Sequence, residues 1–362
     1  MAETILKEEE SVARKLRSLY QKYGYLPYKM SKFEEYDLYA RNKEFLEGAR
    51  IVTFNDTDGK LLALKPDITL SIVKNDSDGG AKRKVYYNET VYRAQKKSSG
   101  FKELLQTGLE CIGEIDLYDE YEALYLAAAS LGEISESFVL DISHRGILSA
   151  VINEVNGDEE FSKQIMRLIA EKNMHGLTTF CETNSMKPDK FLALVNAYGT
   201  PEKALPKLEK LCESEESKVA YERLKALCAM LENTKFQDKL RLDFSVVGSG
   251  NYYDGIVFNG FIDGIGEAVL SGGRYDRLLA RMGKKSGAIG FAVYLDLLEG
   301  FCKKRKTEDV DIVVLYDDGV ELETLAKTVQ TLIAEGNTVS AQRQKGALRC
   351  KKVIDLSHSR LN

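Results

Sequence analysis

The chain has 362 residues, with 51 Lys or Arg against 56 Asp or Glu, and a formal net charge of −5 at pH 7. Hydrophobic residues make up 44% of it and charged residues 30%. A chain of this length buries a full core, and we expect one large domain with an insertion or appendage. No run of 18 or more apolar residues and no charged-then-apolar leader is present, which argues against a membrane span or secretion and predicts a cytoplasmic protein.

The cysteine pattern and the net charge argue against a metal-binding protein and against a nucleic-acid-binding protein. The six cysteines are scattered, without a CxxC pair or a Cys/His cluster at zinc spacing, so we expect reduced thiols and no metal site. Proteins that bind nucleic acid usually carry a basic surface patch, because neutralisation of the phosphates dominates their affinity. The acidic balance of this chain therefore argues against tRNA as a partner.

The first third of the chain predicts a helix followed by two hairpins. The N-terminal segment has a helical stripe that stops at Gly24. Residues 51–66 hold two apolar runs around Asp58 and Gly59, and this pair favours a tight turn because both residues tolerate positive φ. Residues 84–113 form a second predicted hairpin, since both of its strands are rich in β-branched and aromatic residues.

The rest of the chain alternates between helical and sheet character. The pattern predicts, in chain order, a helix at 121–131, a buried strand at 138–143, a helical block at about 146–236, strands between 240 and 273, and a helix at 288–301. Residues 310–362 read as strand, helix, strand and a short basic end. Strands kept apart from helical blocks favour an α+β fold around an antiparallel sheet. We expect a core at 1–305 with the helical insertion, and a truncated α/β segment at 306–362.

Polar side chains alternate with apolar ones along the second predicted hairpin. Successive side chains of a strand point to opposite faces, so each strand should present one polar row. The rows are Glu89, Arg93 and Gln95 on the first strand, and Gln106, Gly108 and Glu110 on the second. A glycine between two polar residues leaves room for a ligand, which favours a pocket. The alternative is a cross-strand salt bridge on a solvated sheet face.

Residues 91–113 resemble the second signature motif of the histidyl-tRNA synthetase family. The resemblance places Arg93 at the arginine that binds phosphate, and Gln95 where a glutamate would contact adenine. Gln106 and Glu110 fall on positions that line the histidine pocket in that family. The class II synthetase fold, an antiparallel sheet flanked by helices, is implied by the same resemblance.

Residues 64–74 resemble the family segment that holds the amino group of histidine. Asp67 stands in place of the family's glutamate, and Thr69 is retained. A shorter acid at that point can still bind an ammonium group. The alternative role for Asp67 is to cap the helix that begins beside it.

Two arginines of the family are replaced in this chain. Residues 243–258 resemble a segment whose arginine stabilises the charge that develops when histidine attacks ATP; here Gly248 occupies that position, Asn251 replaces an aspartate, and Tyr253 is kept. Residues 271–300 resemble the third motif, whose helix carries an arginine that clamps the ATP phosphates, and here that position is Leu297. Leucine offers no donor to a phosphate. The paired loss predicts that adenylation is lost.

Other polar residues read as structural. His144 follows a predicted strand, and we expect it to make an ordinary hydrogen bond there, not a catalytic or metal contact. Arg274 and Tyr275 are expected to hold the Gly-rich strand against its helix.

The pattern of kept pocket and lost arginines resembles the ATP phosphoribosyltransferase regulatory subunits, synthetase paralogues of histidine biosynthesis. That resemblance implies a noncatalytic subunit that enables the short-form catalytic subunit, takes part in feedback by L-histidine, and needs no cofactor. It also implies a homodimer within a hetero-oligomer. The implied pocket comprises Asp67, Thr69, Arg93, Gln106, Glu110 and Tyr253. Two alternatives stay open, a divergent active histidyl-tRNA synthetase and a synthetase-like module that binds an amino acid or RNA.

Overall fold

The computed structural model describes residues 8–46, 50–77, 81–94, 100–248, 252–298, 301 and 308–357. Its contacts divide the chain into a large unit within Lys7–Phe301 and a small unit that contains residues 308–357. No helix in the described part of the chain is long and apolar enough to cross a membrane.

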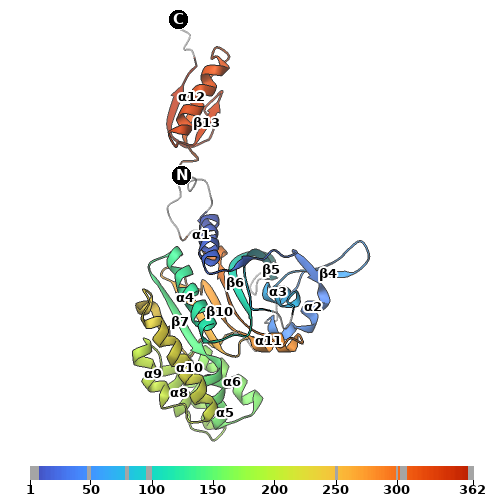
Figure 1. Ribbon diagram of the computed structural model, residues 1–362, viewed down its shortest axis with the longest axis vertical. Coiled ribbons are helices and arrows are strands. Elements are labelled where there is room, and N and C mark those ends of the chain that lie inside the picture. The colour runs from blue at the N-terminus through green and yellow to red at the C-terminus, as the bar shows by residue number, and fades with distance from the viewer. Residues whose placement is uncertain are drawn as a thin grey trace. The chain divides into compact units, whose positions relative to one another are not determined.

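An eight-stranded sheet forms the centre of the large unit (Figure 1). Its strand order is β1 (Leu26–Pro27), β5 (Arg83–Ala94), β6 (Phe101–Gly113), β11 (Gly287–Tyr294), β10 (Leu270–Arg274), β9 (Ile256–Ile262), β7 (Phe138–His144) and β8 (Leu240–Leu242). The pairs from β5 to β7 are antiparallel, whereas the two outer strands, β1 and β8, pair in parallel. The predicted antiparallel α+β sheet is confirmed, with a parallel strand added at each edge.

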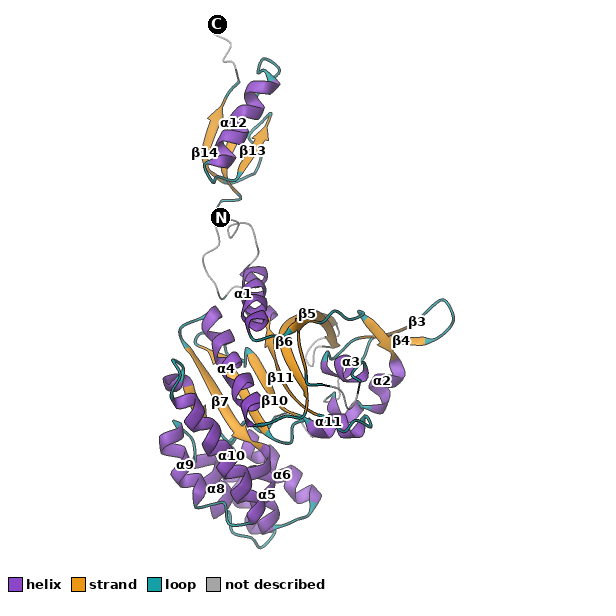
Figure 2. Ribbon diagram, viewed as in Figure 1, coloured by secondary structure: helices purple, strands orange, loops and turns teal. Residues whose placement is uncertain are grey.

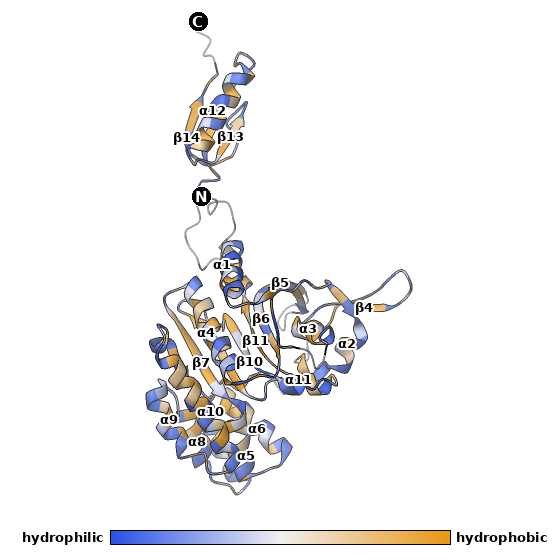
Figure 3. Cartoon of the chain, in the orientation of Figure 1, coloured by the Kyte–Doolittle hydropathy of each residue, from blue (hydrophilic) through white to orange (hydrophobic). Residues whose placement is uncertain are grey.

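Helices cover both faces of this sheet. One face packs against α1 (Glu8–Lys22) and α4 (Leu117–Ile134), and its core includes Leu109 and Phe291. The other face packs against α2 (Tyr36–Arg41), the short 3₁₀ helix η1 (Lys43–Phe45), α3 (Thr69–Lys74) and α11 (Asp276–Arg281). Neighbouring residues of one strand, such as Tyr86 and Tyr87, enter opposite cores, as the period of a strand requires. Figure 3 shows apolar residues concentrated on the sheet and on the helix faces turned toward it.

The first predicted hairpin forms a small sheet of its own. Strands β3 (Thr53–Asn55) and β4 (Leu61–Leu64) are antiparallel, and β2 (Phe33–Glu35) pairs with the far edge of β4. Gly59 in the turn has φ of 81°, a left-handed conformation that glycine adopts without strain. Figure 2 shows this hairpin projecting from the rest of the large unit. Both predicted hairpins are confirmed.

Six helices follow β7 and precede β8, as the sequence pattern predicts. They are α5 (Arg145–Val155), α6 (Glu159–Ala170), α7 (Met174–Thr183), α8 (Asp189–Asn196), α9 (Pro201–Glu209) and α10 (Glu215–Glu232), with the 3₁₀ helix η2 (Gln237–Lys239) after them. Side chains of Asp158, Asn173 and Ser214 accept hydrogen bonds from backbone N–H groups in the first turns of α6, α7 and α10. Such caps stabilise a helix end by about 1 kcal/mol and explain why the block breaks where it does.

The predicted helix at 288–301 is wrong over most of its length. Residues up to Tyr294 form β11, which lies between β6 and β10, and among the described residues of this span only Leu295–Leu298 adopt a helical turn, the 3₁₀ helix η3. A strand buried on both faces is apolar throughout, so its sequence cannot be told from a buried helix by periodicity.

The small unit is a three-stranded parallel sheet with one helix. Its order is β13 (Val339–Gln342), β12 (Val310–Leu315) and β14 (Cys350–Asp355), and α12 (Leu322–Ala334) connects β12 to β13. The predicted strand, helix and strand are confirmed, whereas β14 was missed. The strand β14 is hard to recognise in the sequence because it contains Lys351 and Lys352. An edge strand carries charged residues at its exposed positions.

Candidate functional site

A cavity of about 140 Å³ lies on the α3 side of the central sheet. Its walls come from α3, β5, β6, β10, β11 and the Tyr252–Tyr253 segment, so strands distant in sequence meet around it. All six residues predicted for the pocket line this cavity: Asp67, Thr69, Arg93, Gln106, Glu110 and Tyr253. Pockets for drug-sized ligands measure roughly 300–1,000 Å³, so this smaller cavity suits a molecule of about amino-acid size.

Glu110 is the polar centre of the cavity. Its carboxyl group is 2% exposed and accepts one hydrogen bond from Thr69 Oγ at 2.8 Å and another from the Tyr275 hydroxyl at 2.5 Å. Burial raises the pKa of Glu110 to about 8; the Tyr275 and Thr69 hydrogen bonds oppose this rise, and the nearby Asp67 adds to it. The acid therefore keeps its proton to a higher pH than an exposed carboxyl group, and a cationic ligand would favour its ionised form.

Gly290 on β11 lies directly against the Glu110 carboxyl. A Cβ atom there would overlap the carboxylate and the backbone carbonyl of Leu109. Only glycine lets the acid lie flat against the neighbouring strand, which pairs Gly290 with Glu110 in register. The glycines of this segment therefore shape the floor of the cavity.

Gln106 shares the cavity face of β6 with Glu110. It is 4% exposed, and its Nε2 has no hydrogen-bond partner within the described residues. A buried amide donor left without a partner costs about 1–3 kcal/mol, so a ligand acceptor at this point would be favoured. Glu89 pairs with Lys65 at 2.6 Å, not with β6. These contacts favour the pocket over a salt bridge on a solvated sheet face.

Asp67 caps α3, which is one of the two roles considered for it, and it also lines the cavity. Its Oδ1 accepts a hydrogen bond from the Leu70 N–H at 2.9 Å and so caps the first turn of α3. Its Oδ2 lies 3.9 Å from Arg93 Nη2, while Arg93 Nε donates to the Pro66 carbonyl at 2.8 Å. Burial raises the pKa of Asp67, and the charge of Arg93 opposes the rise. The cavity thus holds an acid and a guanidinium side by side, which can receive the ammonium and carboxylate of one amino acid.

Three tyrosines form one wall of the cavity. The rings of Tyr252 and Tyr253 meet edge to face with centroids 4.9 Å apart, and the rings of Tyr252 and Tyr275 are 5.6 Å apart. The sequence predicts a structural role for Tyr275; in the structure its hydroxyl donates a hydrogen bond to Glu110, and the residue also lines the cavity. Its place directly after the Gly-rich strand β10 was the available signal.

Gly248 and Leu297, where the resemblance predicts that an arginine is replaced, do not line this cavity. Gly248 has φ of 70°, and a Cβ there would lie 2.6 Å from a Tyr253 ring carbon. Leu297 is half-buried in η3. The backbone at Gly248 is thus adapted to glycine, which makes an arginine at this conformation strained. Gln95 and Asn251 lie outside the described residues.

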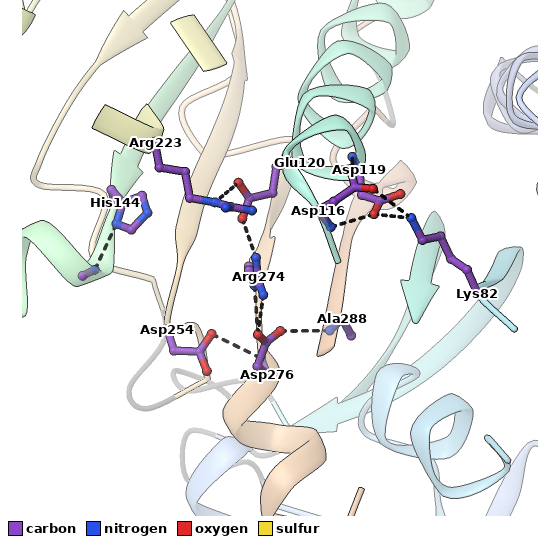
Figure 4. Close-up of polar contacts among 11 residues, drawn as sticks. Lys82, Asp116, Asp119, Glu120, His144, Arg223, Asp254, Arg274, Asp276 and Ala288 are labelled. Atoms are coloured by element: carbon purple, nitrogen blue, oxygen red, sulfur yellow. Dashed lines mark hydrogen bonds and ion pairs between the residues drawn. The ribbon is translucent and has the colours of Figure 1, made fainter. Parts of the chain in front are cut away.

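A charged network beside the sheet joins the helical block to the core (Figure 4). Glu120 at the start of α4, 1% exposed, accepts from Arg223 Nε of α10 at 2.6 Å and from Arg274 Nη1 of β10 at 3.0 Å. Arg274 also pairs with Asp276 at 2.7 Å. A buried carboxylate held by two guanidinium groups fixes the elements that carry them. The structural role predicted for Arg274 agrees with these contacts.

His144 takes part in this region as a helix cap. Its Nδ1 accepts a hydrogen bond from the Gly146 N–H at 3.2 Å, at the start of α5. Burial lowers the pKa of His144 to about 4, and the charges of Arg223 and Arg274 lower it further. The imidazole is therefore neutral at pH 7, in keeping with the structural role predicted for it. Within the described residues no group of three or more His, Cys, Asp or Glu side chains is placed to hold a metal ion.

The chain resembles known proteins over most of its length. The family model described as histidyl-tRNA synthetase matches residues 2–298. A protein of Bacillus mycoides (strain KBAB4) named ATP phosphoribosyltransferase regulatory subunit is 27% identical over 321 residues, which cover 85% of this chain and 76% of that protein. A structure described as an ATP phosphoribosyltransferase regulatory subunit/histidyl-tRNA synthetase from Bacillus halodurans C superposes with a TM-score of 0.83 at 23% identity, over 98% of this chain and 96% of the other.

A further similar structure comes from a complex. A chain of the ATP phosphoribosyl transferase complex from Thermotoga maritima superposes with a TM-score of 0.64 at 18% identity, over 80% of this chain and 97% of the other. At these identities the solved structures support the fold, which is that of a class II aminoacyl-tRNA synthetase core. The chain belongs to the histidyl-tRNA synthetase family. The predicted resemblance to its regulatory-subunit relatives is confirmed.

The raised pKa of Glu110 predicts how pH affects stability. The carboxyl group has a pKa of about 8 when folded against 4.5 as its ordinary value, so between these pH values the folded state binds more protons than the unfolded state. The wild type therefore loses stability from this group as pH rises from about 5 to 8. Glu110→Gln removes that loss. The free energy of unfolding of the variant, minus that of the wild type, should therefore increase as pH rises. Urea denaturation of both proteins from pH 5 to 9 measures this difference.

Glu103→Gln is the matched control, because Glu103 is exposed on the same strand. Its difference from the wild type should stay constant with pH. A constant difference for Glu110→Gln as well would contradict the assigned burial effect.

The backbone at Gly248 predicts a second stability change. Gly248→Ala should lose about 1–2 kcal/mol, because an L-residue at this φ is strained and its Cβ meets Tyr253. Gly266→Ala is the control, since a Cβ there has no neighbour within 4 Å and its φ is not left-handed. Equal denaturation midpoints for the two variants would rule out strain at Gly248.

Proposed function

We propose that this chain is the noncatalytic regulatory subunit of an ATP phosphoribosyltransferase, the enzyme of the first step of histidine biosynthesis. In this role it enables a short-form catalytic subunit and takes part in feedback by histidine. The observation that carries the proposal is the cavity around Glu110, which keeps an amino-acid-sized set of polar groups while two arginines of the synthetase motifs are replaced. The name of the Bacillus mycoides relative supports it.

L-Histidine is the proposed ligand of the cavity. Asp67 and Thr69 would receive its ammonium group, and Arg93 beside them its carboxylate. Glu110 and Gln106 would hold the imidazole, because a carboxyl group and a free amide donor can satisfy both ring nitrogens. Tyr253 closes the cavity along its aromatic wall. Each polar group of histidine thus has a complementary side chain.

The same site lacks the cations that adenylation needs. Activation of an amino acid by ATP places negative charge on the reacting phosphate, and loss of one preorganised donor typically costs about 10²–10³-fold in rate. Gly248 and Leu297 remove two, and the strained conformation at Gly248 disfavours a return to arginine. Synthetase activity is therefore lost in this proposal.

The assembly follows from the same role. The chain forms a homodimer that joins catalytic subunits in a hetero-oligomer, and tRNA is not a partner. The structure from Thermotoga maritima, a complex by its description, supports an assembly of two kinds of subunit.

Histidine binding is tested by calorimetry on the purified chain and on its complex with the short-form catalytic subunit. The wild type should bind L-histidine, and Thr69→Val should weaken binding about tenfold, because the hydroxyl that holds Glu110 is lost. Thr179→Val, exposed on α7, is the control and should leave affinity unchanged. If L-histidine bound neither to the purified chain nor to the complex, the proposal of a histidine site would be wrong.

An ATP–pyrophosphate exchange assay separates the proposal from an active synthetase. The chain should show no histidine-dependent exchange, and it should co-purify with the short-form catalytic subunit. Robust exchange would favour a divergent synthetase instead. Absence of both exchange and co-purification would favour a binding module of another pathway.

A further inference from the structure

A second and larger cleft lies between the helical block and the core of the large unit. Its volume is about 540 Å³, and it shares no lining residue with the cavity around Glu110. Helices α5 and α6 form one side, while α11 and residues 247–248 form the other. Arg145, Ser149 and Asn153 recur every four residues along α5, so they share the face turned to the cleft.

Basic side chains dominate this cleft, although the whole chain is acidic. Four cationic side chains line it, Arg145, Lys163, Arg167 and Arg277, against two acidic ones, Glu44 and Glu159. Both acids already have partners. Glu44 Oε1 lies 2.5 Å from Arg281 Nε, and Glu159 Oε1 lies 2.8 Å from Lys163 Nζ.

The three arginines of the cleft lack an anionic partner. Within the described part of the chain, no guanidinium nitrogen of these three arginines forms an ion pair within 4.0 Å of a carboxylate oxygen, although the backbone N–H of Arg277 donates to Asp254 Oδ2 at 2.6 Å. The Nη1 of half-buried Arg145 donates to the Val247 carbonyl at 2.8 Å. Burial lowers the pKa of Arg145, and the charge of Arg277 lowers it further. Arg145 is therefore destabilised by desolvation and by repulsion from Arg277, and an anion bound beside it would oppose both effects.

We propose that this cleft binds a small ligand through a diphosphate group. Arginine presents a planar fork of donors that matches phosphate oxygens in pairs. The arginines come from opposite sides of the cleft, α5 and α6 against α11, so they can hold two adjacent phosphates better than one. Ser149 and Asn153 add neutral groups that can bind phosphate oxygens or the remainder of the ligand.

The dimensions favour a small molecule over a nucleic acid. The volume falls within the roughly 300–1,000 Å³ of small-molecule sites. A long polyanion would also meet the net charge of −5 of the chain, which opposes its approach. The inference stands whether or not the chain is a regulatory subunit, because its residues and its probe differ from those of the histidine site.

Titration calorimetry with inorganic pyrophosphate at low ionic strength tests the proposal on the full chain. The wild type should bind, and added salt should weaken binding. Arg277→Gln and Arg167→Gln should each lower the affinity roughly five- to tenfold, and the double variant should abolish measurable binding, because each removes a charge-assisted contact. Both side chains are exposed, so thermal melting should show that these variants fold.

Arg17→Gln is the matched control. Arg17 is an exposed arginine on α1 that lines neither cavity, and its loss should leave pyrophosphate affinity unchanged. Lack of pyrophosphate binding by the wild type, or equal affinities for wild type and double variant, would overturn the proposal. It would also be overturned if a single-stranded RNA oligonucleotide bound at these arginines and pyrophosphate failed to displace it.

Discussion

The buried carboxyl group of Glu110 sets the constraint on which the site depends. It is held by the hydroxyls of Thr69 and Tyr275, and it lies flat against the next strand because Gly290 has no side chain. A carboxyl group buried in this way is destabilised when ionised, and its pKa rises to about 8. The protein thus carries an acid that favours a cationic or imidazole-bearing partner.

The surrounding structure keeps this acid in place while changing the chemistry nearby. The ion pair of Glu120 and Arg274 holds α4 against β10, and β10 is the neighbour of β11, which lines the cavity. At Gly248 the backbone has turned to a left-handed conformation that packs against Tyr253. In the proposed function, recognition of a small ligand is separate from activation by ATP: the first would depend on the cavity, and the second on cations that the resemblance expects at Gly248 and Leu297.

Much of this could be predicted from the sequence, because polar and apolar residues alternate along the strands of both hairpins and the first hairpin turns at Gly59. The same alternation brings Gln106 and Glu110 to one face. Other features depend on contacts that no local pattern encodes. Strand β11 is apolar on both faces and resembles a buried helix. Tyr275, which follows β10, reaches Glu110 of β6 across the intervening strand β11. The partner of Arg93 also could not be predicted from local sequence. In the folded chain Asp67 lies beside Arg93, whereas Glu89 forms its ion pair with Lys65.

The most direct test of the central claim is a crystal structure of the chain in complex with the short-form catalytic subunit at saturating L-histidine. The account predicts histidine in the cavity, with its imidazole against Glu110 and Gln106 and its ammonium group against Asp67. An empty cavity in that crystal, with histidine bound only to the catalytic subunit, would contradict it.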